Sequence, residues 1–219
     1  MRESLVEHFS ALDATGVCRS AFIRRIPGID VRQDKAEALR RLEATHQEIR
    51  RALGAGDWPL LYGEQIHSDK IATVDRPAPK DHQFPGCDGL ITNQREILLG
   101  IYVADCCAVY LVDPVHRVIG LVHSGKKGTE LEIAGKAVAL MEEKFGSRPA
   151  DLVVELSPCI RPPHYEVDFA AQIIAQCRAR GVTKIHDAGV CTASDLESYY
   201  SYRAEKGRTG RMLALLGLI

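Results

Sequence analysis

The sequence contains no apolar stretch long enough to cross a membrane. Its longest apolar runs, residues 97–104 and 212–219, are each eight residues long and contain glycine, whereas a membrane-spanning helix needs about 20 residues. The N-terminal stretch MRESLVEHFSALDATG carries charges and has no continuous apolar segment, so we expect no secretory signal peptide there. These absences predict a cytoplasmic protein with no membrane partner.

A disulfide framework and an excess of one charge are also missing. The seven cysteines are odd in number and sparse, which does not suit a disulfide scaffold. We therefore expect reduced thiols with structural, metal-binding or catalytic roles. Lysine and arginine number 28 against 29 aspartate and glutamate, and this balance argues against a general nucleic-acid-binding protein.

Internal repeats and low-complexity segments are absent as well. A chain of 219 residues buries about 70% of its surface on folding, enough for one sizeable core. We therefore expect residues 1–219 to form a single domain.

Hydrophobic periodicity predicts three helices. Apolar residues recur at three- and four-residue steps over residues 34–53, which is the spacing of an amphipathic helix. Thr129 and Glu132 form a capping box that predicts the start of a second helix, ended by Gly146. Residues 169–180 predict a third helix.

Short apolar runs between turn residues predict the strands. They cover residues 97–103, 108–112, 117–122, 151–156 and 212–218. The proline-rich segment 77–86 is predicted to be a loop. Strands alternate with helices, but some connections are too short for parallel crossovers. The predicted fold class is therefore α/β (α+β), with mixed sheets covered by helices.

Three residues stand out as candidates for chemistry: His67 in GEQIHSD, Cys106 in VADCCAV and His123 in GLVHSGKKG. Each follows or ends an apolar stretch, where a side chain can be both held and exposed. Histidine and cysteine suit Zn²⁺, and three protein ligands leave the fourth tetrahedral position open. The same residues could equally be packed or hydrogen-bonded side chains without a metal. Neighbouring side chains of an extended chain point to opposite faces, so Cys107 is expected to pack inside.

The segment after His123 is a candidate anion site. Gly125, Lys126, Lys127 and Gly128 lead into the helix predicted at Thr129, and amides at a helix N-terminus favour anions. A solvated turn with two surface lysines is the alternative, since no Walker A motif is present.

Further basic residues lie near the C-terminus. They are Arg203, Lys206, Arg208 and Arg211. Such a cluster is typical of a solvated face, although it could bind phosphate. Aromatic residues do not interleave with it in the pattern of a nucleic-acid-binding surface.

Six motifs resemble, in order, those of the laccase-domain family, also called the YfiH or multicopper polyphenol oxidoreductase family. They are EQIHSD, CDGLIT, VADCCAVYLVD, LVHSGKKG, SPCI..PHYEV and CT…YYSYRAEKGRTGR, between residues 60 and 211. The resemblance implies a single-domain α/β sandwich with mixed sheets enclosed by helices. It also implies a metal site, usually zinc, with His67, Cys106 and His123 as ligands.

The resemblance implies an activity on purine nucleosides. Family members are described as phosphorylases of adenosine, inosine, guanosine or methylthioadenosine, and some also deaminate adenosine. Others are named copper polyphenol oxidases or a peptidoglycan editing factor. Several copper centres need many clustered histidines, and only two of the eight here are plausible ligands. Zinc is therefore the expected cofactor, with copper as the alternative.

The leading hypothesis is a zinc-dependent purine nucleoside phosphorylase whose partners are a purine nucleoside and phosphate. Cys106, His67 and His123 would hold the metal, and Asp105 would orient a ligand or act as acid or base. Phosphate would bind at residues 125–128, with Arg203 as a further contact to phosphate or substrate.

Two other hypotheses remain open. One is a metal-free cysteine hydrolase with Cys106 as nucleophile. The other is a non-catalytic descendant, because Lys126 and Lys127 stand where the family has an aromatic residue and an arginine.

Overall fold

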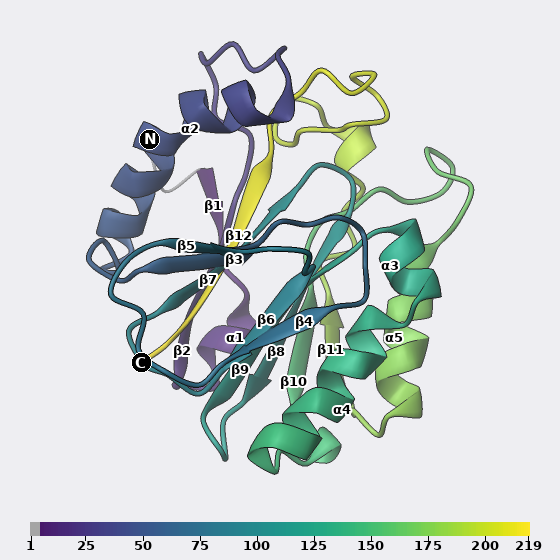
Figure 1. Cartoon of the computed structure of the whole chain (residues 1–219). Coiled ribbons are helices and arrows are strands. Elements are labelled where there is room, and N and C mark those ends of the chain that lie inside the picture. Colours follow the sequence, from purple (N-terminus) through teal and green to yellow (C-terminus); the bar gives the residue numbers. More distant parts are fainter. Residues whose placement is uncertain (1–4) are drawn as a thin grey trace.

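Two six-stranded sheets form the centre of the molecule (Figure 1). The computed structural model describes residues 5–219, so Arg2 and Glu3 of the N-terminal stretch lie outside the described residues. The first sheet has the spatial order β1 (Val6–Glu7), β2 (Cys18–Ile23), β12 (Met212–Leu218), β7 (Leu98–Val103), β3 (Leu60–Gly63) and β5 (His82–Phe84). The second has the order β11 (Lys184–Asp187), β10 (Val153–Leu156), β8 (Cys107–Asp113), β9 (Val118–Ser124), β6 (Gly89–Thr92) and β4 (Ile71–Val74).

Both sheets are mixed, as the short connections predict. In the first, β3 runs parallel to β7 and β5, while β2, β12 and β7 pair antiparallel. In the second, the outer pairs β10–β11 and β4–β6 are parallel, and the pairs between them are antiparallel. The α/β class with mixed sheets is confirmed.

The second sheet is buried on both faces. Along β8, Ala108, Tyr110 and Val112 share a core with the first sheet, whereas Val109 and Leu111 share a second core with the helices. Alternate strand residues point to opposite faces, so every residue of β8 is buried. This two-sided burial explains why the strand has a continuous apolar sequence.

Helices cover both outer faces of this pair of sheets (Figure 1). They are α2 (Lys35–Ala52), α3 (Lys126–Glu130), α4 (Ile133–Phe145) and α5 (Phe169–Ala179). The short helix α1 (Ser10–Asp13) instead contacts β2 of the first sheet and β10 of the second, and 3₁₀ turns lie at Pro149–Asp151 and Thr192–Ser194. The buried stripe of α2 packs into the core of the first sheet, while α4 and α5 share the core of the second. Within residues 5–219 no helix is long and apolar enough to cross a bilayer.

The predicted helix over residues 34–53 is confirmed, including its ends. Asp34 caps the N-terminus of α2 by accepting a hydrogen bond from Glu37 N at 3.0 Å. Gly54 follows the C-cap with a φ of 70°, a left-handed conformation that glycine adopts at low cost. The helix predicted at residues 169–180 is confirmed as α5.

Two local predictions are wrong. Thr129 caps no helix, because it lies inside α3 and its hydroxyl contacts Ser124 Oγ at 2.8 Å. The following helix α4 begins instead after Glu132, whose φ is 60°. The predicted loop over residues 77–86 contains β5, because main-chain pairing with β3 recruits residues whose side chains are mostly exposed.

The apolar runs do not predict how β7 and β8 are arranged. These consecutive strands belong to different sheets, so the chain crosses from one sheet to the other at residues 104–106. Asp105 has a φ of 82° at this crossing. The turn therefore places Cys106 at the junction of the two sheets.

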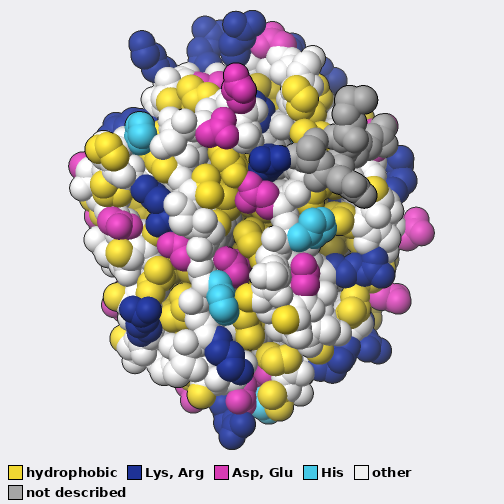
Figure 2. Space-filling model, turned by 180° about the vertical axis from the view of Figure 1, so that it is seen from behind, with side chains coloured by type: hydrophobic (Ala, Val, Ile, Leu, Met, Phe, Trp, Pro, Cys, Tyr) yellow, Lys and Arg dark blue, Asp and Glu magenta, His cyan; other side chains and the backbone are white. Residues whose placement is uncertain are grey.

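The molecular surface carries both signs of charge. On the face seen in Figure 2, basic and acidic side chains are interspersed and neither sign gathers into a continuous patch. This distribution agrees with the formal net charge of −1.

Candidate metal centre and cavity

His67, Cys106 and His123 come together from three separate segments. His67 lies in the loop between β3 and β4, Cys106 in the turn between β7 and β8, and His123 near the end of β9. Their potential ligand atoms all lie within 4.8 Å of one another, and the two imidazole rings are 4.9 Å apart between centroids. His123 is buried and His67 is exposed, so the cluster is held on one side and open on the other.

Asp88, a residue that the sequence analysis did not single out, organises the cluster. It is fully buried just before β6. Its Oδ1 accepts hydrogen bonds from His67 N and His123 Nδ1, both at 2.9 Å. Its Oδ2 accepts from Ser68 N at 2.7 Å and Ser68 Oγ at 2.8 Å. Because His123 uses Nδ1 for this bond, its Nε2 is left for a metal.

A second contact fastens the loop that carries His67. Gln65 donates from Nε2 to Tyr102 O at 2.6 Å and accepts from Tyr102 N at 2.9 Å. This side chain thus continues the pairing of β3 with β7 beyond the last paired backbone residues. Gln65 and His67 both have a φ above 60°, so the loop is held in a tightly curved conformation.

The electrostatics of the cluster favour a charged pair. Burial opposes ionisation of Cys106, but the neighbouring His123 and His67 lower its pKa to about 6. Burial likewise opposes protonation of His123, but Cys106 and Asp88 raise its pKa to about 9. Burial alone would raise the pKa of Asp88, yet hydrogen bonds from His123 and Ser68 lower it to about 2. At neutral pH this combination favours the thiolate, which is the form that binds metals.

The donor set fits a single metal ion. One thiolate and two imidazoles match the ligands that zinc prefers, and the spacing of the three donors allows one ion to reach all of them. Two histidines and a cysteine also suit copper. In the part of the chain that the structure describes, this is the only group of three potential ligands.

Gly125 is required by its contact with Cys106. A Cβ atom at this position would lie 2.5 Å from Cys106 Sγ, so any side chain here would displace the sulfur. Gly125 is also the N-cap of α3, and its carbonyl accepts a hydrogen bond from Thr129 N at 2.9 Å.

Residues 125–128, which the sequence predicts to bind phosphate, begin a helix earlier than expected. Residues 126–128 are the first turn of α3 rather than a loop before a helix. Lys126 lines the neighbouring cavity, but Lys127 and Gly128 do not. Gly128 is instead buried against His123 O.

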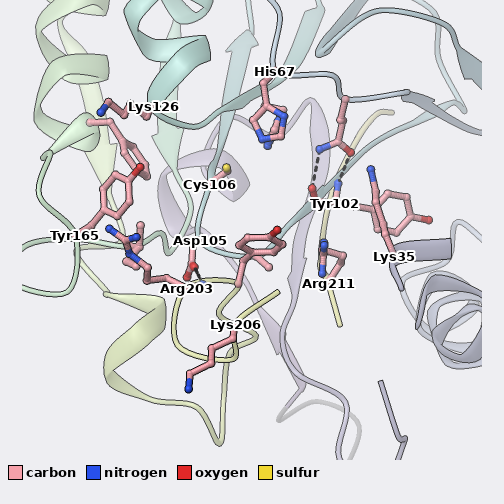
Figure 3. Close-up of a pocket in the computed structure, with 16 residues that line it drawn as sticks. Lys35, His67, Tyr102, Asp105, Cys106, Lys126, Tyr165, Arg203, Lys206 and Arg211 are labelled. Atoms are coloured by element: carbon pink, nitrogen blue, oxygen red, sulfur yellow. Dashed lines mark hydrogen bonds between the residues drawn. The ribbon is translucent and has the colours of Figure 1, made fainter. Parts of the chain in front are cut away.

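A cavity of about 660 Å³ opens beside the three candidate ligands, a size within the range of small-molecule sites. Figure 3 shows His67 and Cys106 between two groups of side chains. One wall carries Lys126, Tyr165 and Arg203, with Ile160 and Phe169. The opposite wall carries Lys35, Tyr102 and Arg211, with Gln65.

The carboxylate of Asp105, predicted to orient a metal ligand or to act as acid or base, is hydrogen-bonded to two other segments. It accepts hydrogen bonds from Thr192 Oγ1 at 2.8 Å and from Arg203 N at 2.7 Å. It therefore ties the segments around residues 192 and 203 to the turn that carries Cys106. The carboxylate that accepts a hydrogen bond from the candidate ligand His123 is that of Asp88.

The predicted C-terminal basic cluster divides into two parts. Arg203, Lys206 and Arg211 line the cavity, whereas Arg208 does not. The guanidinium of Arg203 pairs with Glu166 at 2.7 Å and lies 5.0 Å from the centroid of the Tyr165 ring. Arg211 is half-buried, so it is not part of a solvated face.

Comparisons with known proteins agree on one family. Residues 14–173 and 166–219 match the family model described as multi-copper polyphenol oxidoreductase laccase. A protein of Deinococcus radiodurans named purine nucleoside phosphorylase is 30% identical, with 84% of this chain and 80% of that protein covered. Purine nucleoside phosphorylase YlmD of Geobacillus stearothermophilus is 32% identical, with 70% of each covered.

Solved structures show the same fold. The crystal structure of YlmD from Geobacillus stearothermophilus superposes with a TM-score of 0.82 at 24% identity and covers 92% of each chain. The crystal structure of the Bacillus licheniformis hypothetical protein YfiH gives a TM-score of 0.80 at 21% identity, covering 92% of this chain and 93% of that chain.

Proposed function

Because this chain belongs to the multi-copper polyphenol oxidoreductase laccase family, we propose that it is a zinc-dependent purine nucleoside phosphorylase. The observation that carries the proposal is the His67–Cys106–His123 cluster, which opens into a cavity lined by both aromatic and basic side chains. Relatives named purine nucleoside phosphorylase support the same reaction class. Phosphate would attack the anomeric carbon of the ribose as the bond to the base breaks, giving ribose 1-phosphate and free purine.

The wall that contains Tyr165 supplies a surface for the purine. Tyr165 and Phe169 contact each other edge to face at 5.9 Å between centroids, and Ile160 adds apolar surface beside them. A purine can pack against such rings through its own flat face. Lys126 and Arg203 would add polar contacts to the nucleoside from the same wall.

The chain itself positions the reacting groups. Asp88 fixes His123 and the backbone of His67, and Asp105 fixes the turn of Cys106 against the segment of Arg203. Zinc held by His67, Cys106 and His123 would supply a Lewis acid at the edge of the cavity. Holding nucleoside and phosphate together in one cavity provides much of the rate enhancement in such a reaction.

A metal-free cysteine hydrolase is the second candidate, and the charged Cys106–His123 pair favours it. A thiolate beside an imidazolium is the arrangement of an activated cysteine nucleophile. The phosphorylase needs bound zinc, whereas the hydrolase needs a free Cys106 thiolate, which a bound zinc ion would occupy. Metal analysis of the purified protein therefore separates them: one zinc per chain supports the phosphorylase.

The decisive test is a product assay on zinc-loaded protein. Adenosine and inosine are supplied with and without phosphate, and we expect phosphate-dependent release of free base. Cys106→Ala should lower this rate by at least about 100-fold, because a metal ligand is lost. Cys191→Ala, outside the cavity, is the matched control. Inosine formed from adenosine without phosphate would reveal the deaminase activity that we propose as a side reaction. Unchanged zinc content and turnover in Cys106→Ala would refute the proposal.

A further inference from the structure

The two walls of the cavity differ in how their positive charges are balanced. On one wall, Glu166 pairs with Arg203 at 2.7 Å, and its pKa is also lowered by the charge of Lys126. On the other wall, Lys35 and Arg211 form no ion pair with any residue from 5 to 219. The second wall therefore presents two cations that have no ion-pair partner within these residues, although the negative charge of the Cys106 thiolate acts on Arg211.

The acidic side chains nearest to this pair are engaged elsewhere. Asp88 is hydrogen-bonded to the His67 loop and His123, and Glu64 accepts from Gly86 N at 2.8 Å. Near Arg211, Asp105 holds Thr192 and the backbone of Arg203, and Glu205 pairs with Arg25 at 2.6 Å. Each carboxylate thus has stronger partners than Lys35 or Arg211.

Arg211 is held in a fixed orientation. Its Nη1 donates to Thr209 O at 2.9 Å and to Gly210 O at 2.8 Å, and its guanidinium lies 5.8 Å from the centroid of the Tyr202 ring. Among the described residues, Nε and Nη2 have no hydrogen-bond partner. Two donors of a planar guanidinium are therefore available, the group that recognises phosphate oxygens in a bidentate manner.

Lys35 lies close enough to Arg211 for the two positive charges to interact. Its side chain is exposed to solvent, yet partial burial and the positive charge of Arg211 lower its pKa. Figure 3 shows Lys35, Tyr102 and Arg211 on one side of Cys106, with Tyr165 and Arg203 on the other. Two like charges that have no ion-pair partner cost stability, and such arrangements are concentrated at functional sites.

We infer that Lys35 and Arg211 form the subsite for the phosphate co-substrate, across the cavity from the wall proposed to bind the purine. This inference rests on the proposed phosphorylase function, and it replaces residues 125–128 as the phosphate site. The metal ligands then lie between the nucleoside and the phosphate, where the anomeric carbon is attacked.

The test is the affinity of the zinc-loaded protein for inorganic phosphate. It is measured without nucleoside from the rise in melting temperature with phosphate concentration, against chloride of equal ionic strength. Lys35→Gln should weaken the affinity about 10-fold or more, as expected for a charged hydrogen bond. Lys127→Gln removes the same charge outside the cavity and should change the affinity less than about twofold.

Three further variants and one further ligand test whether phosphate binds specifically at Lys35 and Arg211. Lys35→Arg should restore phosphate affinity, and Arg211→Lys, which keeps the charge but loses the planar group, should lower it. A larger loss in Lys126→Gln than in Lys35→Gln would place phosphate on the opposite wall and overturn the inference. The inference also fails if Lys35→Gln weakens the binding of adenosine 5′-monophosphate but not the binding of inorganic phosphate, because the subsite then serves a nucleotide.

Turnover separates this inference from the function on which it rests. In an active enzyme, Lys35→Gln should raise the KM for phosphate about 10-fold and leave the KM for nucleoside unchanged. If the protein releases no base but its phosphate affinity still depends on Lys35, the subsite stands and the proposed function fails. Equal phosphate affinity in Lys35→Gln and the unchanged protein overturns the subsite whatever the activity.

Discussion

Residues that are neighbours in the sequence of this protein can lie in different environments and have different roles. Cys106 lines the cavity, whereas Cys107 is fully buried in the core beneath the helices. The alternation of an extended chain predicts this division, and it is confirmed. No such rule predicts Asp88, because an acidic residue before an apolar strand does not reveal which distant groups will contact it. Only the folded chain brings His67 N and His123 Nδ1 to the same carboxylate oxygen, Oδ1.

Replacing Asp88 tests its role as the organiser of the metal site. Asp88→Asn keeps the size but loses the charge that holds His123, and its amide cannot accept as many hydrogen bonds. We expect zinc affinity to fall about 10- to 100-fold, the usual effect of losing the carboxylate behind a histidine ligand. Competition with a chromophoric chelator measures the affinity.

Asp69→Asn is the matched control for this prediction. Asp69 is also close to His67 in sequence, but its carboxylate contacts Lys136 at the surface. Its replacement should leave zinc affinity unchanged. Equal zinc affinity in Asp88→Asn and the unchanged protein would show that the two histidines need no support from Asp88.

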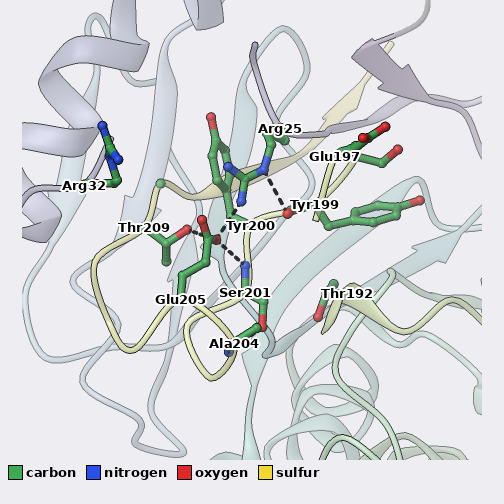
Figure 4. A network of polar contacts seen from close by, with 12 residues as sticks. Arg25, Arg32, Thr192, Glu197, Tyr199, Tyr200, Ser201, Ala204, Glu205 and Thr209 are labelled. Carbon is green, nitrogen blue, oxygen red and sulfur yellow. Dashed lines mark hydrogen bonds and ion pairs between the residues drawn. The ribbon is translucent and has the colours of Figure 1, made fainter. Parts of the chain in front are cut away.

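At the scale of elements, the loop over residues 201–210 is fixed by a network around Glu205 (Figure 4). Glu205 accepts from Arg25 at 2.6 Å and from Ser201 N at 3.1 Å, and Thr209 Oγ1 also donates to it. Arg25 in turn donates to Tyr199 O at 3.0 Å and lies 4.4 Å from the centroid of the Tyr200 ring. The network thus anchors the segment that carries Arg203 and precedes Arg211.

Loss of the charge on Glu205 should loosen this loop. Burial opposes ionisation of Glu205, but hydrogen bonds from Arg25, Thr209 and Ser201 lower its pKa. Glu205→Gln leaves Arg25 without its partner and should lower the free energy of unfolding by about 1–3 kcal/mol, measured by urea denaturation. The exposed Glu197 provides the control variant Glu197→Gln. If both variants unfold at the same urea concentration, Glu205 does not anchor the loop.

The elements predicted from sequence are those whose signal is local. The helix α2 shows a regular apolar spacing with an Asp34 cap and Gly54 at its end, and the strands β7, β8 and β9 are continuous apolar runs. The capping box at Thr129 was a false local signal, since the Thr129 hydroxyl satisfies a neighbour instead of the helix backbone. Short strands such as β4 and β11, with partly exposed residues, have no comparable pattern.

At the scale of the whole molecule, sheet pairing limits what sequence alone can predict. The apolar runs of β7 and β8 do not reveal that they belong to different sheets. The crossing between them places Cys106 at the sheet junction, where the loop of His67 and the end of β9 also meet. The family resemblance identifies the three candidate ligands and the sequence singles out Arg211, but only the fold places Lys35 beside Arg211 in the cavity.

The pH dependence of the stability of the whole molecule should reflect two buried groups whose pKa values are shifted in opposite directions. Burial, followed by the charge of Arg50, lowers the pKa of His46 to about 4, and within residues 5–219 neither ring nitrogen has a hydrogen-bond partner. Burial and the charge of Asp187 raise the pKa of Glu155 to about 7. His46 is therefore kept neutral in the folded state, and Glu155 is kept protonated below neutral pH.

The sign of each contribution follows from which state binds more protons. As the pH falls from 6.5 to about 4, the unfolded chain protonates His46 while the folded chain does not, so up to about 3 kcal/mol of stability is lost. As the pH rises from 4.5 to about 7, the unfolded chain ionises Glu155 first, so up to about 3 kcal/mol is again lost. The two effects oppose each other between pH 4.5 and 6.5.

Two substitutions should separate these contributions in urea denaturation at a series of pH values. His46→Phe keeps an aromatic ring against Tyr102, whose ring centroid lies 6.1 Å from that of His46. The substitution removes the loss of stability that His46 causes at acid pH. The stability of this variant relative to the unchanged protein should therefore rise steadily as the pH is lowered from 6.5 to 4. Glu155→Gln should show the reverse, with a relative gain as the pH is raised from 4.5 to 7. A pH-independent difference for either variant would mean that its side chain titrates alike in the folded and unfolded chains.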